Sequence, residues 1–242
     1  MEFRDEVQNA AADFGMPLTE TQTEQLLLYY RLLLEWNEKI NLTAITEPRE
    51  VAVKHVVDSL SAFDASLFRD GARVIDVGTG AGFPGVVLKI YFPSMELVLL
   101  DSLQKRVRFL EAVVSALGLS GVECVHGRAE ETARQKPYRE RFDLALSRAV
   151  ARLSVLAEYT LPFVRVGGSL LAMKGARYAE EMAEAGQAAK LLGGGAPTAR
   201  TVKLPGLDDG RAIVRIDKER PTPKTYPRKS GTPEKKPLGG QP

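Results

Sequence analysis

The 242-residue chain has little of what disulfide-stapled domains and metal sites are built from. It contains one cysteine, Cys124, two histidines and one tryptophan. A single cysteine excludes an internal disulfide, and the few cysteines and histidines show no spacing typical of metal ligands. We therefore expect no metal ion, and a reducing compartment, the cytoplasm.

Long apolar runs and a strong charge of one sign are also absent. The apolar runs are far too short to cross a bilayer, and the first residues lack the basic start and apolar centre of a signal peptide. We expect a soluble protein with no membrane association. The formal net charge is only +2, but residues 218–242 carry seven Lys or Arg against two Glu, so the basic charge is concentrated in the tail.

The first part of the chain has helical periodicity. Residues 18–39 form an amphipathic pattern that begins with a capping box, Thr19 and Gln22, and residues 48–63 repeat apolar side chains at helical spacing after a proline start signal. The aromatic residues of the first stripe, among them Tyr29 and Trp36, are expected in the core. We assign residues 1–68 to a small helical cap.

Residues 69–218 alternate short β-branched runs with helical stretches. The expected strands are 74–77, 96–100, 122–125, 142–146 and 169–173. The expected helices between them are 85–91, 105–117, 152–164 and 178–192. This alternation predicts a doubly wound α/β domain with a mostly parallel sheet.

Two further runs, 200–204 and 212–216, are joined by a short connection that contains Gly and Asp. They predict a closing antiparallel hairpin, which favours a methyltransferase-type sheet over an all-parallel dinucleotide-binding sheet. Residues 219–242 form a basic tail with six prolines and no apolar period. We expect this tail to be extended or mobile when unbound.

A glycine-rich loop follows the first expected strand, with Gly78, Gly80, Gly82 and Gly85 within eight residues. Such a loop brings bare backbone N–H groups close to a ligand, although the same glycines also suit a simple tight turn. Residues 80–85 even satisfy the dinucleotide spacing G-x-G-x-x-G, so the loop alone does not identify the cofactor.

Two carboxylates favour S-adenosylmethionine over a dinucleotide. Asp76 comes just before the first glycine, where an acid orders the loop and balances the positive charges of that cofactor. Asp101 ends the second expected strand, where its oxygens can accept both ribose hydroxyls, a role that NAD sites share. Asp76 is therefore the sharper discriminator.

The next two strands lead to the same edge of the sheet. After the third strand, the Ala129 backbone and Glu130 are candidates for the adenine edge, and the fourth strand delivers Arg148 beside the methionine end. Arg148 can hold a carboxylate in a bidentate pair, but a solvated loop arginine is the alternative.

Seven motifs in order along the chain resemble the bacterial small-subunit ribosomal RNA methyltransferase G family, also called glucose-inhibited division protein B. They are WNEKINLT (36–43), HVVDSL (55–60), VIDVGTGAGFPG (74–85), DSLQKR (101–106), GRAEE (127–131), SRA (147–149) and MKG (173–175). The resemblance implies a Rossmann-like class I methyltransferase fold and S-adenosylmethionine-dependent methylation of guanine N7 in the 530 loop of 16S ribosomal RNA.

The resemblance also implies site residues and a partner. The cofactor pocket, together with the loop residues above, is expected to comprise Asp76, Gly78, Thr79, Gly80, Gly82, Phe83, Asp101, Ser102, Leu103, Ala129, Glu130 and Arg148. The partner is 16S ribosomal RNA, within the small ribosomal subunit or its precursor, and we expect the chain to act as a monomer.

Guanine N7 has an in-plane lone pair, so methyl transfer to it requires no general base, only alignment of the reacting atoms. Arg148, His55 and Asp58 are candidates for positioning the acceptor, although His55 and Asp58 also suit a hydrogen-bonded helix surface. The candidates for RNA phosphate contacts are Lys174, Arg177, Lys224, Arg228 and Lys229.

Three other functions remain open at this point. A methyltransferase with a small-molecule or protein acceptor would share the cofactor loop and act without RNA. A dehydrogenase would bind NAD. A non-catalytic RNA-binding assembly factor would keep a vestigial pocket, against which the intact Asp76 and Asp101 argue.

Overall fold

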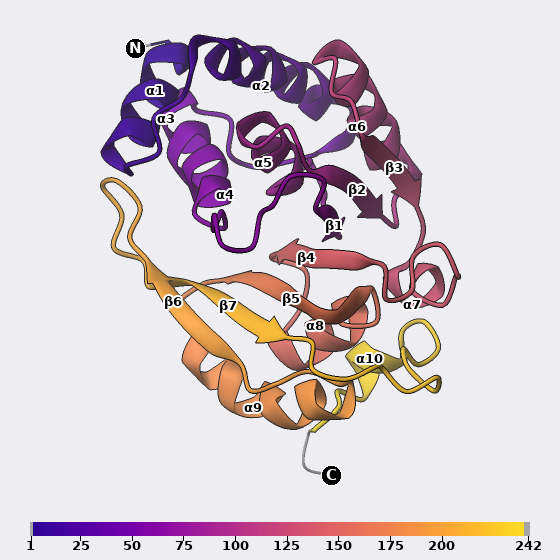
Figure 1. Cartoon of the computed structure of the whole chain (residues 1–242). Helices are drawn as coiled ribbons and strands as arrows, with labels where there is room; N and C mark the ends of the chain where they lie inside the picture. Colours follow the sequence, from indigo (N-terminus) through magenta and orange to yellow (C-terminus); the bar gives the residue numbers. More distant parts are fainter. Residues whose placement is uncertain (1, 240–242) are drawn as a thin grey trace.

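The computed structural model describes residues 2–239 (Figure 1); the last three residues of the expected tail lie outside this range. A seven-stranded sheet has the order β3-β2-β1-β4-β5-β7-β6, in which β7 runs opposite to the other six strands. The strands are β1 (Arg73–Val77), β2 (Glu96–Asp101), β3 (Val122–His126), β4 (Phe142–Arg148), β5 (Val164–Lys174), β6 (Thr198–Val202) and β7 (Arg211–Asp217). The predicted α/β fold with a C-terminal antiparallel hairpin is confirmed.

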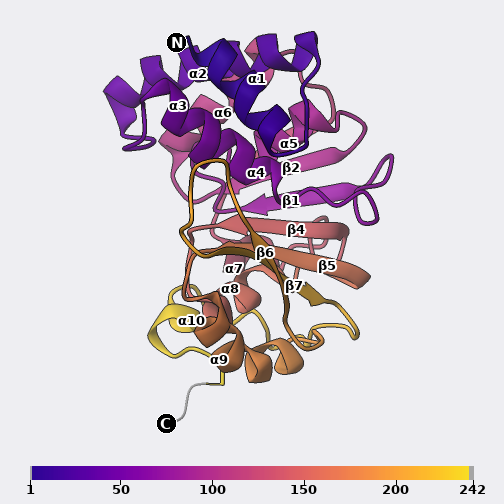
Figure 2. The ribbon, with the colours of Figure 1, turned by 90° about the vertical axis from the view of Figure 1, so that its left-hand side faces the viewer.

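The helices fall into two groups with the strands between them (Figure 2). The first group is α1 (Phe3–Asp13), α2 (Glu20–Ile40), α3 (Pro48–Val51), the π-helix η1 (Ala52–Val57), α4 (Asp58–Leu60), α5 (Gly85–Tyr91) and α6 (Gln104–Ala116). The second is α7 (Ala129–Thr132), α8 (Leu153–Thr160), α9 (Tyr178–Leu191) and α10 (Thr232–Lys235).

Alternating side chains of the strands feed two hydrophobic cores. On β1, Val74 packs into the core shared with the first helix group, whereas Ile75 and Val77 pack into the core under α8 and α9. This period of two is what a sheet covered on both faces requires. The cap shares the first core with α5 and α6, so its described residues, 2–68, are packed against the α/β domain.

The capping box of α2 is confirmed. The Thr19 hydroxyl accepts a hydrogen bond from the Gln22 backbone N–H at 3.3 Å, and the Gln22 side chain accepts one from the Thr19 N–H at 2.9 Å. Tyr29 is buried, as expected, and its hydroxyl donates to the Ala81 carbonyl in the glycine loop. The cap therefore contacts the loop directly.

Three local expectations differ from the structure. Helix α1 was not predicted. Residues 52–57 of the expected helix 48–63 form the π-helix η1, whose hydrogen bonds span five residues instead of four, and the apolar pattern of so short a stretch does not distinguish the two. The expected helix 152–164 ends at residue 160, because Val164 already belongs to β5.

The tail was expected to be extended or mobile. Instead, Tyr226 and Leu238 pack against the second core, and the described tail carries the short helix α10, which contacts α8 and buries Pro233. Ion pairs and hydrogen bonds rather than apolar periodicity hold this segment, and hydropathy patterns do not detect them.

Candidate active site

The glycine loop connects β1 to α5, and its conformation is fixed from below by Asp76. This carboxylate is fully buried, and its Oδ2 accepts hydrogen bonds from the Thr79 hydroxyl at 2.7 Å and the Gly85 N–H at 2.9 Å. Its Oδ1 has no partner within the described residues. Burial raises the pKa of Asp76 to about 6, despite these two hydrogen bonds. The loop is ordered, and one buried acceptor beneath it is left unpaired.

The glycines of the loop face two different sides. Gly78 has φ +70°, and a Cβ there would lie 2.6 Å from Val150 Cγ2 at the open edge of the sheet. Gly82 has φ +97° and faces the cap, where a Cβ would lie 2.7 Å from the Tyr29 hydroxyl. Phe83 is also turned inward and stacks on His55 with ring centroids 4.6 Å apart. Gly82 and Phe83 thus face the cap, away from the first cavity described below.

Asp101 connects the end of β2 to the same loop. Its Oδ2 accepts a hydrogen bond from Gly80 N–H, and its Oδ1 accepts one from Leu103 N–H, both at 2.9 Å. The side chain is nearly buried, with Arg106 at 3.7 Å. Leu103 is one of the exposed large hydrophobic residues. The carboxylate therefore holds the two strand ends at fixed separation.

A first cavity of about 110 Å³ opens at this edge. It is lined by Val77, Gly78, Leu100, Asp101, Ser102, Gly127, Arg128, Ala129, Glu130, Val150 and Tyr159. Glu130 is buried, and burial followed by the charge of Glu130 raises the pKa of Tyr159 to about 12. The predicted residues Gly78, Asp101, Ser102, Ala129 and Glu130 are brought together here.

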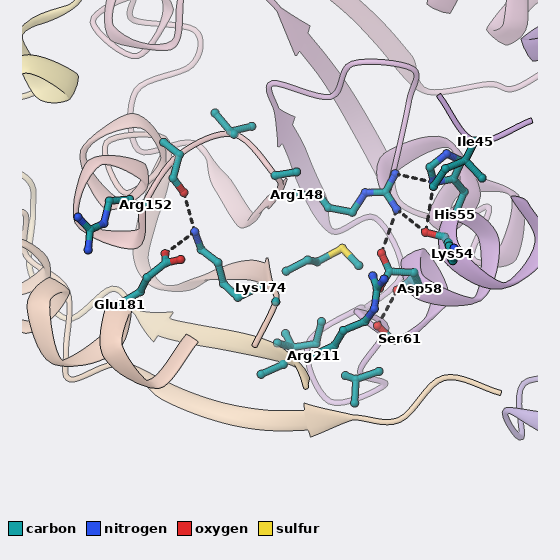
Figure 3. Close-up of a pocket in the computed structure, with 18 residues that line it drawn as sticks. Ile45, Lys54, His55, Asp58, Ser61, Arg148, Arg152, Lys174, Glu181 and Arg211 are labelled. Atoms are coloured by element: carbon teal, nitrogen blue, oxygen red, sulfur yellow. Dashed lines mark hydrogen bonds and ion pairs between the residues drawn. The ribbon is translucent and has the colours of Figure 1, made fainter. Parts of the chain in front are cut away.

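A second cavity of about 540 Å³ lies next to the first, and Val150 lines both (Figure 3). Its walls come from η1 and α4, the ends of β4 and β5, and the start of β7. Asp58 accepts hydrogen bonds from Arg148 at 2.9 Å through Oδ2 and from Arg211 at 3.0 Å through Oδ1. One buried carboxylate thus joins the cap to two strands of the sheet.

Arg148 is bound on the cap side of this cavity. It also donates to the Lys54 carbonyl at 3.1 Å, lies 3.3 Å from His55 Nδ1, and stacks 5.1 Å above the Phe83 ring. Arg148 therefore connects the cap to the sheet. It is not the solvated loop arginine that the sequence left as an alternative.

His55 is held from both ring nitrogens. Nδ1 lies 3.2 Å from the Lys54 carbonyl oxygen and 3.3 Å from the Arg148 guanidinium, and Nε2 lies 2.9 Å from the Thr43 hydroxyl. Burial, and then the charge of Arg148, lower the pKa of His55 to about 4. His55 is neutral at pH 7 and forms part of a rigid wall.

The WNEKINLT motif supports this histidine. Asn37 Oδ1 accepts hydrogen bonds from the backbone N–H of Leu42 at 2.7 Å and of Thr43 at 2.9 Å, just after α2 ends at the left-handed residue Asn41. The turn fixes the Thr43 hydroxyl opposite His55. Sequence reasoning quoted this motif but gave Thr43 no role.

The candidate RNA contacts are in different situations. Lys174 is nearly buried, pairs with Glu181 at 2.7 Å and donates to the Ala151 carbonyl at 2.6 Å. Arg177 is exposed, and its one ion pair within residues 2–239 is with nearby Glu180. Lys224 and Lys229 are exposed, whereas Arg228 pairs with buried Glu158 at 2.6 Å. Lys174 and Arg228 are therefore engaged internally.

Sequence reasoning missed Arg211 and Lys54 on the wall of the second cavity. Arg211 begins β7, 153 residues from Asp58, and no local pattern marks it. Among residues 2–239, no group of three or more His, Cys, Asp or Glu is arranged to hold a metal ion. No helix in that range has the length and apolarity needed to cross a membrane.

Comparison with known sequences identifies one family. The sequence model of the rRNA small subunit methyltransferase G family, GidB, matches residues 22–204. A "Ribosomal RNA small subunit methyltransferase G" from Alkaliphilus metalliredigens is 48% identical over 98% of this chain and 100% of its own length. Another of that name, from Leuconostoc citreum, is 52% identical over 95% of this chain and 97% of its own.

Solved structures agree on the fold. M. jannaschii TYW2, solved in complex with AdoMet, superposes with a TM-score of 0.55 at 13% identity, covering 75% of this chain and 80% of that one. A predicted O-methyltransferase from Agrobacterium tumefaciens superposes with a TM-score of 0.53 at 19% identity, covering 66% and 78%. At these identities the likeness concerns the architecture alone.

Proposed function

The chain belongs to the rRNA small subunit methyltransferase G family, and on this premise we propose that it methylates N7 of one guanine in the 530 loop of 16S ribosomal RNA. Methylation of small-subunit ribosomal RNA with S-adenosylmethionine is the activity that this membership gives it. The assignment of the methylated atom to guanine N7, and of that guanine to the 530 loop, rests on the motif resemblance. The observation that carries the proposal is the convergence of the Asp76 loop, Asp101 and Glu130 on one edge, beside a larger cavity.

The residues of the first cavity fit the cofactor. Asp101 would accept the ribose hydroxyls, the Ala129 backbone and Glu130 would meet the adenine edge, and Gly78 leaves room that a Cβ would fill. The unpaired buried Oδ1 of Asp76 supplies negative charge under the loop. When bound, S-adenosylmethionine supplies an electrophilic methyl group on a positively charged sulfur.

The second cavity would receive the guanine. None of the described wall groups is suited to act as a general base, because His55 is neutral with a low pKa, Asp58 is held by two arginines and Glu181 pairs with Lys174. Guanine N7 needs none, since its lone pair is already available. The task of Arg148, His55 and Asp58 is then to hold a rigid, largely dry wall that orients the base.

Exposed cations would bind the RNA backbone. We assign phosphate contacts to Arg177, whose exposed ion pair is weak, and to Lys224 and Lys229, which have no ion pair within the described residues. The loop guanine would leave its stack to enter the cavity. The chain would act as a monomer in the cytoplasm, on the small subunit or its precursor.

The test is methyl transfer from labelled S-adenosylmethionine to small ribosomal subunits and to naked 16S RNA, with mapping of the modified nucleotide. We expect label at a single guanine N7 in the 530 loop, lost in Asp101→Ala. Label at another atom or nucleotide would refute the finer assignment. If a protein or a small molecule were labelled and neither RNA form were, 16S RNA would not be the methyl acceptor.

A further inference from the structure

The tail crosses the second helix group and is fastened there by a buried ion pair. The Glu158 carboxylate on α8 is fully buried and accepts four hydrogen bonds from Arg228, one from its backbone N–H at 2.7 Å and three from its guanidinium at 2.6–3.1 Å. A buried carboxylate left without a partner would be costly. Arg228 is therefore the anchor of the tail.

A second set of contacts fixes the start of the tail. Lys218 is buried and donates to the carbonyls of Leu161 and Val164 and to the Thr222 hydroxyl, at 2.7–3.0 Å. The Arg139 guanidinium donates to the carbonyls of Thr222 and Tyr226, both at 2.9 Å. With both ends of residues 222–228 fixed, the residues that follow arrive at a defined place.

That place is the outer side of the first cavity. Gly231 N–H donates to Glu130 Oε1 at 2.9 Å, and the Ser230 hydroxyl donates to Glu131 Oε1 at 2.8 Å. Glu130 lines the cavity and lies on α7, which has only four residues. So short a helix has little rigidity of its own, and the tail holds both of its acids, one through a backbone N–H and one through a hydroxyl.

The anchor also adjoins a second wall of the same cavity. Glu158 is followed on α8 by Tyr159, which lines the cavity, and Glu234 of α10 contributes to raising the pKa of Tyr159. Figure 1 shows the yellow tail running beside α7 and α8. The tail therefore contacts the cavity wall on α7 through Glu130, and it binds Glu158, the residue next to the wall residue Tyr159, on α8.

We propose that tail residues 226–234 are a positioning element of the cofactor pocket, so that docking of the tail and binding on the adenosine side reinforce each other. Arg228 acts through Glu158, and Gly231 acts through Glu130, without touching the cofactor themselves. The inference rests on the proposed function only for the identity of the cofactor, and it is independent of the RNA acceptor. It divides the basic tail into an anchor, Arg228, and exposed lysines.

The test measures binding of S-adenosylhomocysteine by calorimetry, with no RNA present. We expect Arg228→Met to weaken binding roughly tenfold, Arg228→Lys to restore part of the affinity, and the matched control Lys236→Ala, an exposed tail lysine, to stay within twofold. In steady-state assays the KM for S-adenosylmethionine should rise in Arg228→Met, with little change in kcat or in the KM for RNA.

Two further measurements keep the proposal falsifiable if Arg228→Met does not fold. The double variant Glu158→Gln/Arg228→Met leaves no uncompensated charge and should fold, yet still bind S-adenosylhomocysteine more weakly. In the wild type, S-adenosylhomocysteine should slow amide hydrogen exchange of residues 228–234, because coupling between two sites is reciprocal.

The outcomes separate this inference from the proposed function. Tight S-adenosylhomocysteine binding by a folded Arg228 variant, or unchanged exchange in the tail of the wild type, overturns the inference and leaves RNA methylation standing. Coupled binding without label on 16S RNA overturns the acceptor and supports the inference. A wild type that does not bind S-adenosylhomocysteine overturns both.

Discussion

The two cavities at the carboxyl edge of the sheet are built in different ways. The first is formed by ends of consecutive strands and the short segments after them, with Asp101 and Glu130 in its walls. The second draws on the cap, β4, β5 and β7, so that Asp58 meets Arg148 90 residues away and Arg211 153 residues away. The ends of consecutive strands supply most of the first cavity, whereas segments much farther apart in the sequence are needed to assemble the second.

The charged groups at the two cavities also differ. Asp101 and Glu130 line the first cavity against one arginine, Arg128, and the unpaired oxygen of Asp76 lies beneath its loop, which suits a cationic cofactor. In the second cavity, two arginines share the single charge of Asp58 while His55 is neutral, which leaves net positive charge for an RNA. Variants on each side should therefore separate the two binding events.

The largest effect is expected for Asp101→Ala on cofactor binding. The variant removes a carboxylate that would accept the ribose hydroxyls and that holds Gly80 N–H. Hydrogen bonds to a charged group contribute about 1.5–3 kcal/mol each, so S-adenosylhomocysteine affinity should fall on the order of 100-fold. Calorimetry checks this loss, and RNA affinity measured by filter binding should change less than about threefold.

Asp101→Asn is the matched control. It keeps one acceptor oxygen and the size of the side chain, so it should retain part of the affinity. A comparable loss of RNA affinity in Asp101→Ala would show that the two cavities do not act separately.

The second-largest effect is expected for Asp58→Ala on the other cavity. It leaves Arg148 and Arg211 without their shared counter-charge, and since both keep some solvent access, we expect about 2 kcal/mol of destabilisation, measured by urea unfolding. Disorder of the arginines should lower kcat for RNA about 30-fold, at a KM for S-adenosylmethionine within about threefold of wild type.

Asp209→Ala is the matched control, because Asp209 also pairs with Arg211 but is exposed to solvent. It should change stability by less than about 0.5 kcal/mol. If it matched Asp58→Ala, the shared buried carboxylate would not be the organising group.

The sequence predicted the features that depend on local patterns and missed those that depend on contacts between distant segments. The sheet, the hairpin and the gathering of Asp101, Ala129 and Glu130 were predictable, because strand periodicity and glycine spacing are local. The link from Asn37 through Thr43 to His55 was not, although every member lies in a quoted motif. Hydrogen bonds between segments leave no period in the sequence.

Charge was the least predictable property. Composition does not distinguish Arg228 and Lys174 from exposed Lys229, yet Arg228 pairs with the buried carboxylate of Glu158 and Lys174 with the partly buried carboxylate of Glu181. A basic tail suggests RNA binding when only its composition is known. Which of its cations remain available depends on acids such as Glu158, which sequence reasoning places in a helix without a partner.

A smaller, pH-dependent effect is expected on the cofactor side. The pKa of Asp76 is raised to about 6, so this acid takes up a proton in the free protein as pH falls through 6. Binding of a cationic cofactor favours the ionised form, and S-adenosylmethionine affinity should therefore fall about tenfold between pH 7.5 and pH 5. Calorimetry across this range measures the change.

Asp76→Asn should bind S-adenosylmethionine more weakly at pH 7.5 and show a flat profile down to pH 5. His55 cannot mimic the effect, because its pKa is lowered to about 4 and it stays neutral throughout this range. An equally steep profile in Asp76→Asn would assign the titration to another group.

The smallest effect is expected for the exposed tail lysines. Lys229→Ala should weaken RNA binding only a few-fold at physiological salt and reduce the slope of log affinity against log salt by about 0.7–0.9, the contribution of one phosphate contact. Lys39→Ala, on α2 at the other end of the molecule, is the control and should leave the slope unchanged (Figures 1 and 2).

Because Lys229 adjoins Arg228, the two variants together test whether neighbouring cations have different roles, one in RNA binding and the other in cofactor binding. Lys229→Ala should alter the salt slope and leave S-adenosylhomocysteine affinity intact, whereas Arg228→Met should do the reverse. A reduced slope in Arg228→Met, at full cofactor affinity, would assign Arg228 to the RNA.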